Sequence, residues 1–182
     1  MTRIRSLTDL TFKALGGQPA FRPGDIESFV DARRIAVLAY VRMDGRPNQV
    51  PIWYTYKDGT FFMTTVTDGP KHRALSRSPR VCITIQDEKP PYKAVIIDGE
   101  AKLAPVDHDN DPTAGMAVRY FGKVGAAAYD KVTKETYEAK GLTLITVAPS
   151  EIKGFDNTQA LSAAERGFIG LRERLPIPRR WL

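Results

Sequence analysis

Residues 35–66 have the sequence IAVLAYVRMDGRPNQVPIWYTYKDGTFFMTTV. Three runs rich in β-branched and aromatic residues are separated by Asp44-Gly45 and Asp58-Gly59. Asp-Gly between two such runs is a strong hairpin signal, because tight hairpin turns need residues that tolerate positive φ. The stretch therefore predicts three antiparallel strands joined by short turns. The predicted strands are 35–43, 48–56 and 60–66.

The flanking sequence continues this pattern and adds short helices. Pro70 favours a helix start, since proline in the first helical turn loses no hydrogen bond, and Asp98-Gly99 predicts a bulge or bend inside a long strand. Six strands with peripheral helices indicate a mainly β, α+β fold, an antiparallel β-barrel with helical insertions. The other strands are predicted at 80–86, 92–103 and 141–147, and helices at 25–30, at 70–78, from 112 and at 126–138.

A chain of 182 residues indicates one main domain with appendages. We expect an N-terminal extension at 1–24, a barrel domain at 25–156 and a basic C-terminal arm at 157–182. Residues 166–182 hold five arginines against Glu173 alone and so carry +4 of the formal net charge of +6. The arm is either a solvated terminus or a segment that folds against the barrel or a partner subunit and buries Trp181.

Composition excludes several classes of protein. With 42% hydrophobic and 26% charged residues the chain has the composition of an ordinary globular protein. No apolar run is long enough to predict a membrane span, and residues 1–10 are too polar to predict a signal peptide. We therefore expect a soluble cytoplasmic protein without a membrane partner. Cys82 is the only cysteine and is expected in the core, while His72 and His108 lack partners for a metal site. No nucleic-acid-binding motif accompanies the basic surplus, so nucleic acid is not expected as a partner.

The order of the motifs resembles a known family. The hairpin is followed by GRPNQVPIWY at 45–54, FMTT at 62–65 and KHRALSRSPRV at 71–81. Over about residues 25–155 the chain is similar to the pyridoxamine 5′-phosphate oxidase-like, FMN-binding split β-barrel superfamily, and most similar within it to the flavin/deazaflavin-dependent oxidoreductases of the B type. The resemblance implies a six-stranded antiparallel split β-barrel that forms a homodimer, with the cofactor at the seam between the subunits.

The same resemblance implies where a cofactor phosphate binds. Thr64 and Thr65 end a predicted strand, and Lys71 lies in the first turn of the helix that follows. A phosphate needs a cation, hydroxyl or backbone donors and preferably a helix N-terminus, so the three side chains can converge on one anion. Two alternatives stay open: Lys71 as a solvated lysine, and the threonines as ordinary strand residues.

The resemblance also implies residues beside the cofactor ring. Trp53 offers an aromatic wall, although a tryptophan of the core or of a dimer interface is an equal alternative, and Lys93 on the long strand is expected to reach across the subunit seam. The chain departs from the oxidase branch at Gly69-Pro70 and at Ala94, and it lacks a C-terminal Arg-x-His pair. The ring-binding residues implied are Gln49, Val50, Pro51, Ile52 and Trp53.

Together these features predict a homodimeric oxidoreductase that transfers a hydride between a bound cofactor and a small conjugated organic substrate. Coenzyme F-420 is favoured over FMN, because the B-type resemblance implies it and because the basic surplus can attract the glutamate tail of that coenzyme. Two alternatives come from other classes of function: a non-catalytic carrier or sequestering protein for the same cofactor and, with less support, a nucleic-acid-binding basic barrel. No catalytic acid or base is predicted.

Overall fold

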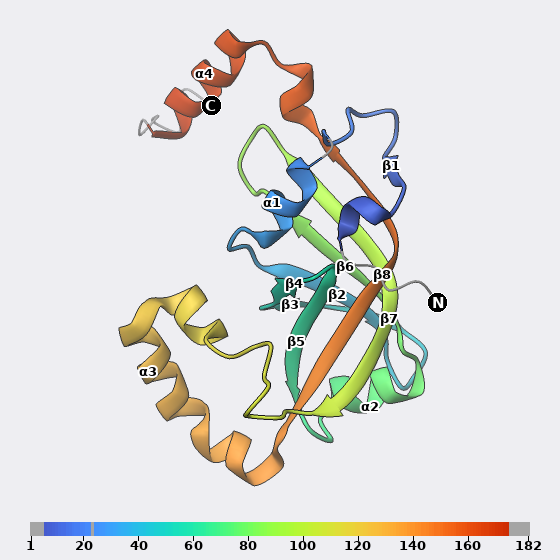
Figure 1. Ribbon diagram of the computed structural model, residues 1–182, viewed down its shortest axis with the longest axis vertical. Coiled ribbons are helices and arrows are strands. Elements are labelled where there is room, and N and C mark those ends of the chain that lie inside the picture. The colour runs from blue at the N-terminus through green and yellow to red at the C-terminus, as the bar shows by residue number, and fades with distance from the viewer. Residues whose placement is uncertain (1–5, 23, 175–182) are drawn as a thin grey trace.

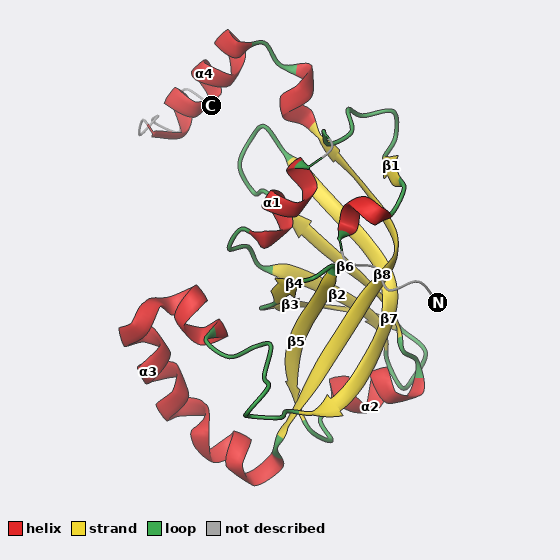
Figure 2. Cartoon of the chain, viewed as in Figure 1, coloured by secondary structure: helices red, strands yellow, loops and turns green. Residues whose placement is uncertain are grey.

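The computed structural model describes residues 6–22 and 24–174, with the backbone alone for the last two. Strands fill the centre of the molecule and helices lie around them (Figures 1 and 2). The strands are β1 (Phe12–Ala14), β2 (Ala36–Val41), β3 (Pro47–Ile52), β4 (Thr55–Lys57), β5 (Thr60–Val66), β6 (Arg80–Gln86), β7 (Lys93–Pro105) and β8 (Leu142–Asp156). The helices are α1 (Asp25–Asp31), α2 (Pro70–Arg77), α3 (Met116–Lys140) and α4 (Ala163–Arg174), and short 3-10 turns cover Leu7–Asp9 and Asn157–Ala160.

One open, twisted sheet contains all of the described strands. Its order is β3-β2-β6-β7-β8-β5-β4, with antiparallel neighbours throughout, while β1 pairs with β8 in parallel. The predicted α+β class with a mainly antiparallel sheet and peripheral helices is confirmed. The predicted strand count is not, because the described residues contain eight strands rather than six.

Two local events account for the extra strands. The predicted strand 48–56 divides into β3 and β4 at Trp53 and Tyr54, where the Tyr54 amide leaves the strand ladder and donates to the Tyr120 hydroxyl at 3.2 Å. The short strand β1 comes from the expected N-terminal extension and pairs with β8 at 152–154. Short-range sequence patterns predict neither change, because Tyr120 and β8, which the two segments contact, are distant along the chain.

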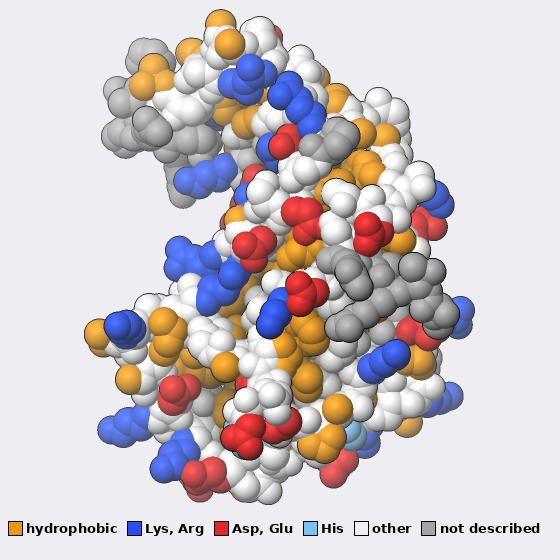
Figure 3. Space-filling view, viewed as in Figure 1, with side chains coloured by type: hydrophobic (Ala, Val, Ile, Leu, Met, Phe, Trp, Pro, Cys, Tyr) orange, Lys and Arg blue, Asp and Glu red, His pale blue; other side chains and the backbone are white. Residues whose placement is uncertain are grey.

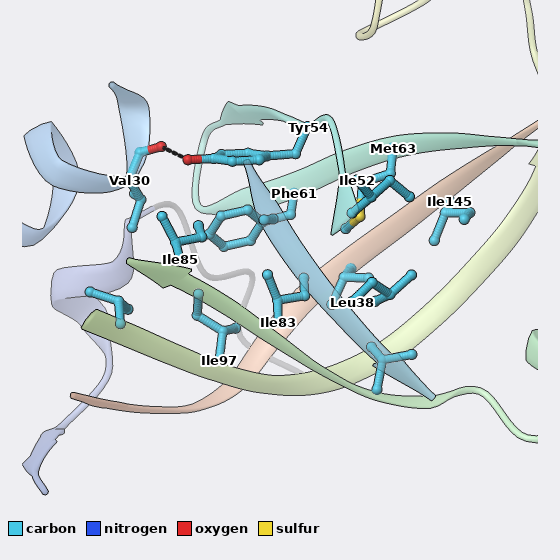
Figure 4. Packing of buried hydrophobic residues seen from close by; sticks show 14 of the residues in the cluster. Val30, Leu38, Ile52, Tyr54, Phe61, Met63, Ile83, Ile85, Ile97 and Ile145 are labelled. Carbon is cyan, nitrogen blue, oxygen red and sulfur yellow. Dashed lines mark hydrogen bonds between the residues drawn. The ribbon is translucent and has the colours of Figure 1, made fainter. Parts of the chain in front are cut away.

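Strand alternation sets which side chains form the core. In β6, Val81, Ile83 and Ile85 are buried, whereas Cys82 is half-buried on the outer face. The expected core position of Cys82 is therefore wrong, because the inward positions of this strand belong to its odd-numbered neighbours. Figure 4 shows the core side chains from both halves of the sheet packed together, with the Tyr54 hydroxyl donating to the Val30 carbonyl at 2.6 Å.

The long helix α3 stands at one side of the sheet (Figure 1). Only Met116 and Ala126 of its 25 residues are buried. The two helical stretches predicted from the sequence are both present and join across a break at Gly122, which has φ 71° and ψ 173°. Such a backbone conformation is open to glycine and strained for other residues, so the helix changes direction there.

The described part of the basic arm projects from the end of β8. Helix α4 extends away from the sheet, and Phe168 and Leu171 are 70% and 55% exposed. Figure 3 shows a hollow between the part of the molecule that carries α4 and the part that carries α3. The predicted burial of Trp181 lies outside the described residues. None of the described helices is long and apolar enough to cross a membrane.

Candidate functional site

A cavity of about 400 Å³ lies where α3 faces the ends of β3 and β5 and the start of α2. Its volume is in the range of small-molecule sites. Five elements that are separate in sequence contribute to its walls, since Leu142 of β8 also lines it, so the cavity exists only in the folded chain. Six residues singled out from the sequence line it: Pro51, Ile52, Trp53, Thr64, Thr65 and Lys71.

Lys71 supplies a cation to this cavity. Gly69 caps α2 and Pro70 is its first residue, so Lys71 lies in the first turn, where the backbone N–H groups have no partner inside the helix. Its side chain is half-buried and makes no hydrogen bond or ion pair with the described residues. Burial lowers the pKa of the Lys71 ammonium. An anion at this point would meet both the ammonium and the positive end of the helix dipole.

Thr64 and Thr65, which both carry a hydroxyl group, line the same cavity. The backbones of both residues are held in the β5–β8 ladder opposite Leu144 and Thr143, and both side chains are half-buried. Within the part of the chain that the structure describes, neither hydroxyl makes a hydrogen bond to a protein group, so both can donate to a bound ligand.

Trp53 forms an aromatic wall together with residues of α3. Its ring stacks on Tyr120 with the centroids 5.0 Å apart and the planes at 9°, and it contacts Phe121 and Tyr129 edge-on or tilted at 4.8 and 5.0 Å. Tyr120 in turn donates its hydroxyl to the Arg34 carbonyl at 2.7 Å. These contacts fix the first part of α3 beside the sheet and give the cavity one rigid aromatic side.

The tyrosine pair Tyr129 and Tyr137 closes the cavity from α3. Both residues line it, and their hydroxyl oxygens are 2.6 Å apart. Burial and the neighbouring Tyr137 raise the pKa of Tyr129, so its hydroxyl keeps its proton. These residues and Met116 were not predicted as site residues. The available signal was the eight-residue spacing of the tyrosines, which places both on one helix face.

Three predicted residues lie outside this cavity in the described chain. Gln49 is exposed, whereas Val50 packs against the core, because successive residues of β3 face opposite sides of the sheet. The Nζ atom of Lys93 lies 3.1 Å from Oδ2 of the fully buried Asp156 and takes part in an intrachain ion pair. The reach of Lys93 across a subunit seam stays a prediction. In the described ranges, no three His, Cys, Asp or Glu residues gather in a way that would bind a metal ion.

Comparisons with known proteins agree with this architecture. Residues 23–156 match the family model described as pyridoxamine 5′-phosphate oxidase. The conserved hypothetical protein Rv2991 from Mycobacterium tuberculosis is similar in structure, with a TM-score of 0.62 and 21% sequence identity over 80% of this chain and 92% of that chain.

Two further solved structures have the same fold. A FAD-binding protein from Mesorhizobium loti has a TM-score of 0.51 and 19% identity over 74% of this chain and 94% of its own. HutZ, the heme storage protein from Vibrio cholerae, has a TM-score of 0.50 and 18% identity over 71% and 92%. No curated protein matches the sequence. At these identities the likeness establishes the fold, and proteins with different ligands share it.

Proposed function

We propose a function from one premise: this chain belongs to the pyridoxamine 5′-phosphate oxidase family. The family membership makes a flavin-type ligand the expected occupant of the cavity beneath α3. We infer that the protein is an oxidoreductase that transfers a hydride between coenzyme F-420 or FMN and a small conjugated organic substrate. Coenzyme F-420 is the favoured cofactor because the chain carries a net charge of +6 and this coenzyme bears carboxylates beyond its phosphate.

The observation that carries the proposal is the half-buried ammonium of Lys71 at the N-terminus of α2, which has no partner among residues 6–22 and 24–174. A buried cation without a partner is costly unless a ligand neutralises it. The residues present fit a cofactor phosphate, since Lys71 provides charge, Thr64 and Thr65 provide hydroxyl donors, and the first turn of α2 provides backbone N–H groups.

The protein's own part in the reaction is binding, orientation and exclusion of water. The bound cofactor supplies the hydride chemistry. Trp53 and its aromatic neighbours on α3 present a flat apolar surface, and Tyr129 and Tyr137 line the side of the cavity that α3 forms. A rigid aromatic wall restricts the orientation of a planar ring, and orientation by itself contributes strongly to rate.

The decisive experiment is an absorption and fluorescence titration of the purified chain with FMN and with coenzyme F-420, followed by a turnover assay of the reduced complex. Saturable binding and oxidation of the reduced cofactor by a conjugated acceptor support the enzyme. Tight binding without turnover supports the carrier instead. Absence of binding to either cofactor contradicts both functions.

A pH prediction follows from the lowered pKa of Lys71. An anionic phosphate favours the charged ammonium, so binding raises the pKa of Lys71 and takes up protons. We expect cofactor affinity to fall as the pH rises through the lowered pKa of free Lys71 towards the ordinary lysine value of 10.5. Titrations at a series of pH values test this.

Lys71→Arg is the matched control, because a guanidinium stays charged and the alkaline decline attributed to this residue should disappear. A decline identical in both proteins would contradict the assignment.

A homodimer is the proposed assembly, with the cofactor near the seam. Pro51, Val37, Thr84 and Ile96 are register partners across β3, β2, β6 and β7. The last three side chains are half-buried on the outer sheet face, while Pro51 also lines the cavity. A second copy seated on this row would therefore approach the cofactor site in both subunits, as a two-fold interface requires.

Light scattering checks this assembly. The expected mass is twice 20.3 kDa, and Thr84→Arg on the outer face should shift it towards the monomer, because a charge would be buried at the seam. Val132→Arg is a matched control on an 80% exposed site of α3 and should leave the dimer intact. A mass of 20.3 kDa for the unmodified protein at micromolar concentration would rule out the shared site.

A further inference from the structure

A second, larger cavity of about 880 Å³ lies next to the first. It lies between the second half of α3, the segment after β7 and the start of β8. Tyr137 and Leu142 line both cavities. The two spaces are therefore neighbours beneath the same helix, and the proposed cofactor site occupies only the smaller one.

The boundary between the cavities lies beside the phosphate-binding residues. Val66 and Lys71 line the smaller cavity, and their chain neighbours Thr67 and His72 line the larger one. A ligand whose phosphate contacts Lys71 would thus have its phosphate next to the larger cavity. A group attached beyond that phosphate could extend into this larger cavity.

The walls of the larger cavity are suited to a polar extension. The Nδ1 atom of His72 is buried and has no hydrogen-bond partner among the described residues, and Asp68 Oδ1 lies 3.6 Å away. The exposed Lys131 and Lys140 line the cavity and form no ion pair within the described part of the chain, whereas Lys134 lies 3.7 Å from Glu138. Asp130 is the other acidic residue of the wall, so its lysines outnumber its carboxylates by three to two. Because α3 buries only two of its residues, the helix stands clear of the sheet along this cavity.

We propose that the larger cavity receives a group joined to the cofactor through its phosphate, so that the protein selects an extended cofactor over FMN. This inference rests on the proposed function. FMN ends at its phosphate, whereas FAD continues into an adenosine and coenzyme F-420 continues into a chain of glutamates. Both extended cofactors share a phosphate that is bonded on its far side, and the unpaired lysines at the cavity suit carboxylates in particular.

The test compares FMN, FAD and coenzyme F-420 as ligands of the full chain in equilibrium titrations. We expect at least one extended cofactor to bind ten-fold or more tightly than FMN. Thr133 lines the larger cavity and not the smaller one, and Thr133→Trp places a large ring in the larger cavity from α3. This variant should remove the preference and leave the FMN affinity within about two-fold, which also shows that the variant is folded.

Val132→Trp is the matched control. It introduces the same side chain one residue away, at a position that is 80% exposed, and it should keep the preference. The double variant Lys131→Gln, Lys140→Gln distinguishes a glutamate chain from an adenosine as the group that occupies the larger cavity. A ten-fold or greater loss for coenzyme F-420 alone identifies a carboxylate chain, whereas an unchanged preference for FAD identifies an adenosine.

The outcomes also separate this inference from its premise. Equal affinities for all three cofactors, or equal losses for all three in Thr133→Trp, would overturn the extension site and leave cofactor binding standing. Failure of all three to bind would overturn the proposed function and the extension site with it.

Discussion

Replacement of Lys71 by alanine is expected to weaken cofactor binding by about 10- to 150-fold, which corresponds to the roughly 1.5–3 kcal/mol of a hydrogen bond to a charged group. The loss is expected in full because Lys71 is half-buried in the first turn of α2, where bulk water screens its charge poorly. The hydroxyls of Thr64 and Thr65 remain in the variant, so binding is weakened rather than abolished.

Fluorescence titration measures this loss. Lys71→Arg keeps the charge and should bind the cofactor far better than the alanine variant. Lys57→Ala, at an exposed lysine of β4, removes the same net charge from another part of the surface and should change the affinity little. If Lys71→Ala and Lys57→Ala bind equally well, the cation at α2 has no part in the site.

Substitution of Gly154 by alanine is expected to destabilise the fold by about 3 kcal/mol, near the upper end for overpacking. Gly154 in β8 pairs with Val95 in β7. A methyl group there would overlap the carbonyl oxygen of Ala94 and lie 3.1 Å from Val95 Cα. These are backbone atoms of the central strand pair, so no side-chain rotation can relieve the overlap.

Thermal unfolding tests this expectation, with a decrease in Tm of roughly 6–12 °C for a chain of this size. Gly167→Ala in α4 is the matched control, because nothing lies within 4 Å of the added methyl group. It should leave stability unchanged or raise it by about 0.5–1 kcal/mol, as alanine is the better helix former. An unchanged Tm for Gly154→Ala would show that β7 and β8 can separate at this point without cost.

Much of the sheet was predictable, because its signals are local. Asp44-Gly45 and Asp58-Gly59 indicated the hairpins, and the structure has positive φ at Gly45, Asp58 and Gly59. The bend predicted at Asp98-Gly99 coincides with a register shift between β7 and β8. Turn chemistry and alternation depend on neighbouring residues alone, so a single sequence contains them.

The site was predictable in part. Thr64, Thr65 and Lys71 follow one another along a strand, a turn and a helix start, so their convergence follows from local geometry. Tyr129 and Tyr137 reach the same cavity from a helix more than 50 residues later. Helix periodicity showed that these tyrosines share a face, but it contains no information about what that face opposes.

Residue order and periodicity thus determined the strands, the hairpins, the helix start at Pro70 and the family resemblance. The division of strand 48–56 at Trp53, the pairing of Lys93 with Asp156 and the position of α3 over two adjoining cavities depended on the folded chain. The physical reason is the range of the interactions. Turns and alternation arise from steric limits within a few residues, whereas aromatic stacking, ion pairs and cavities need groups that only the folded sheet brings together.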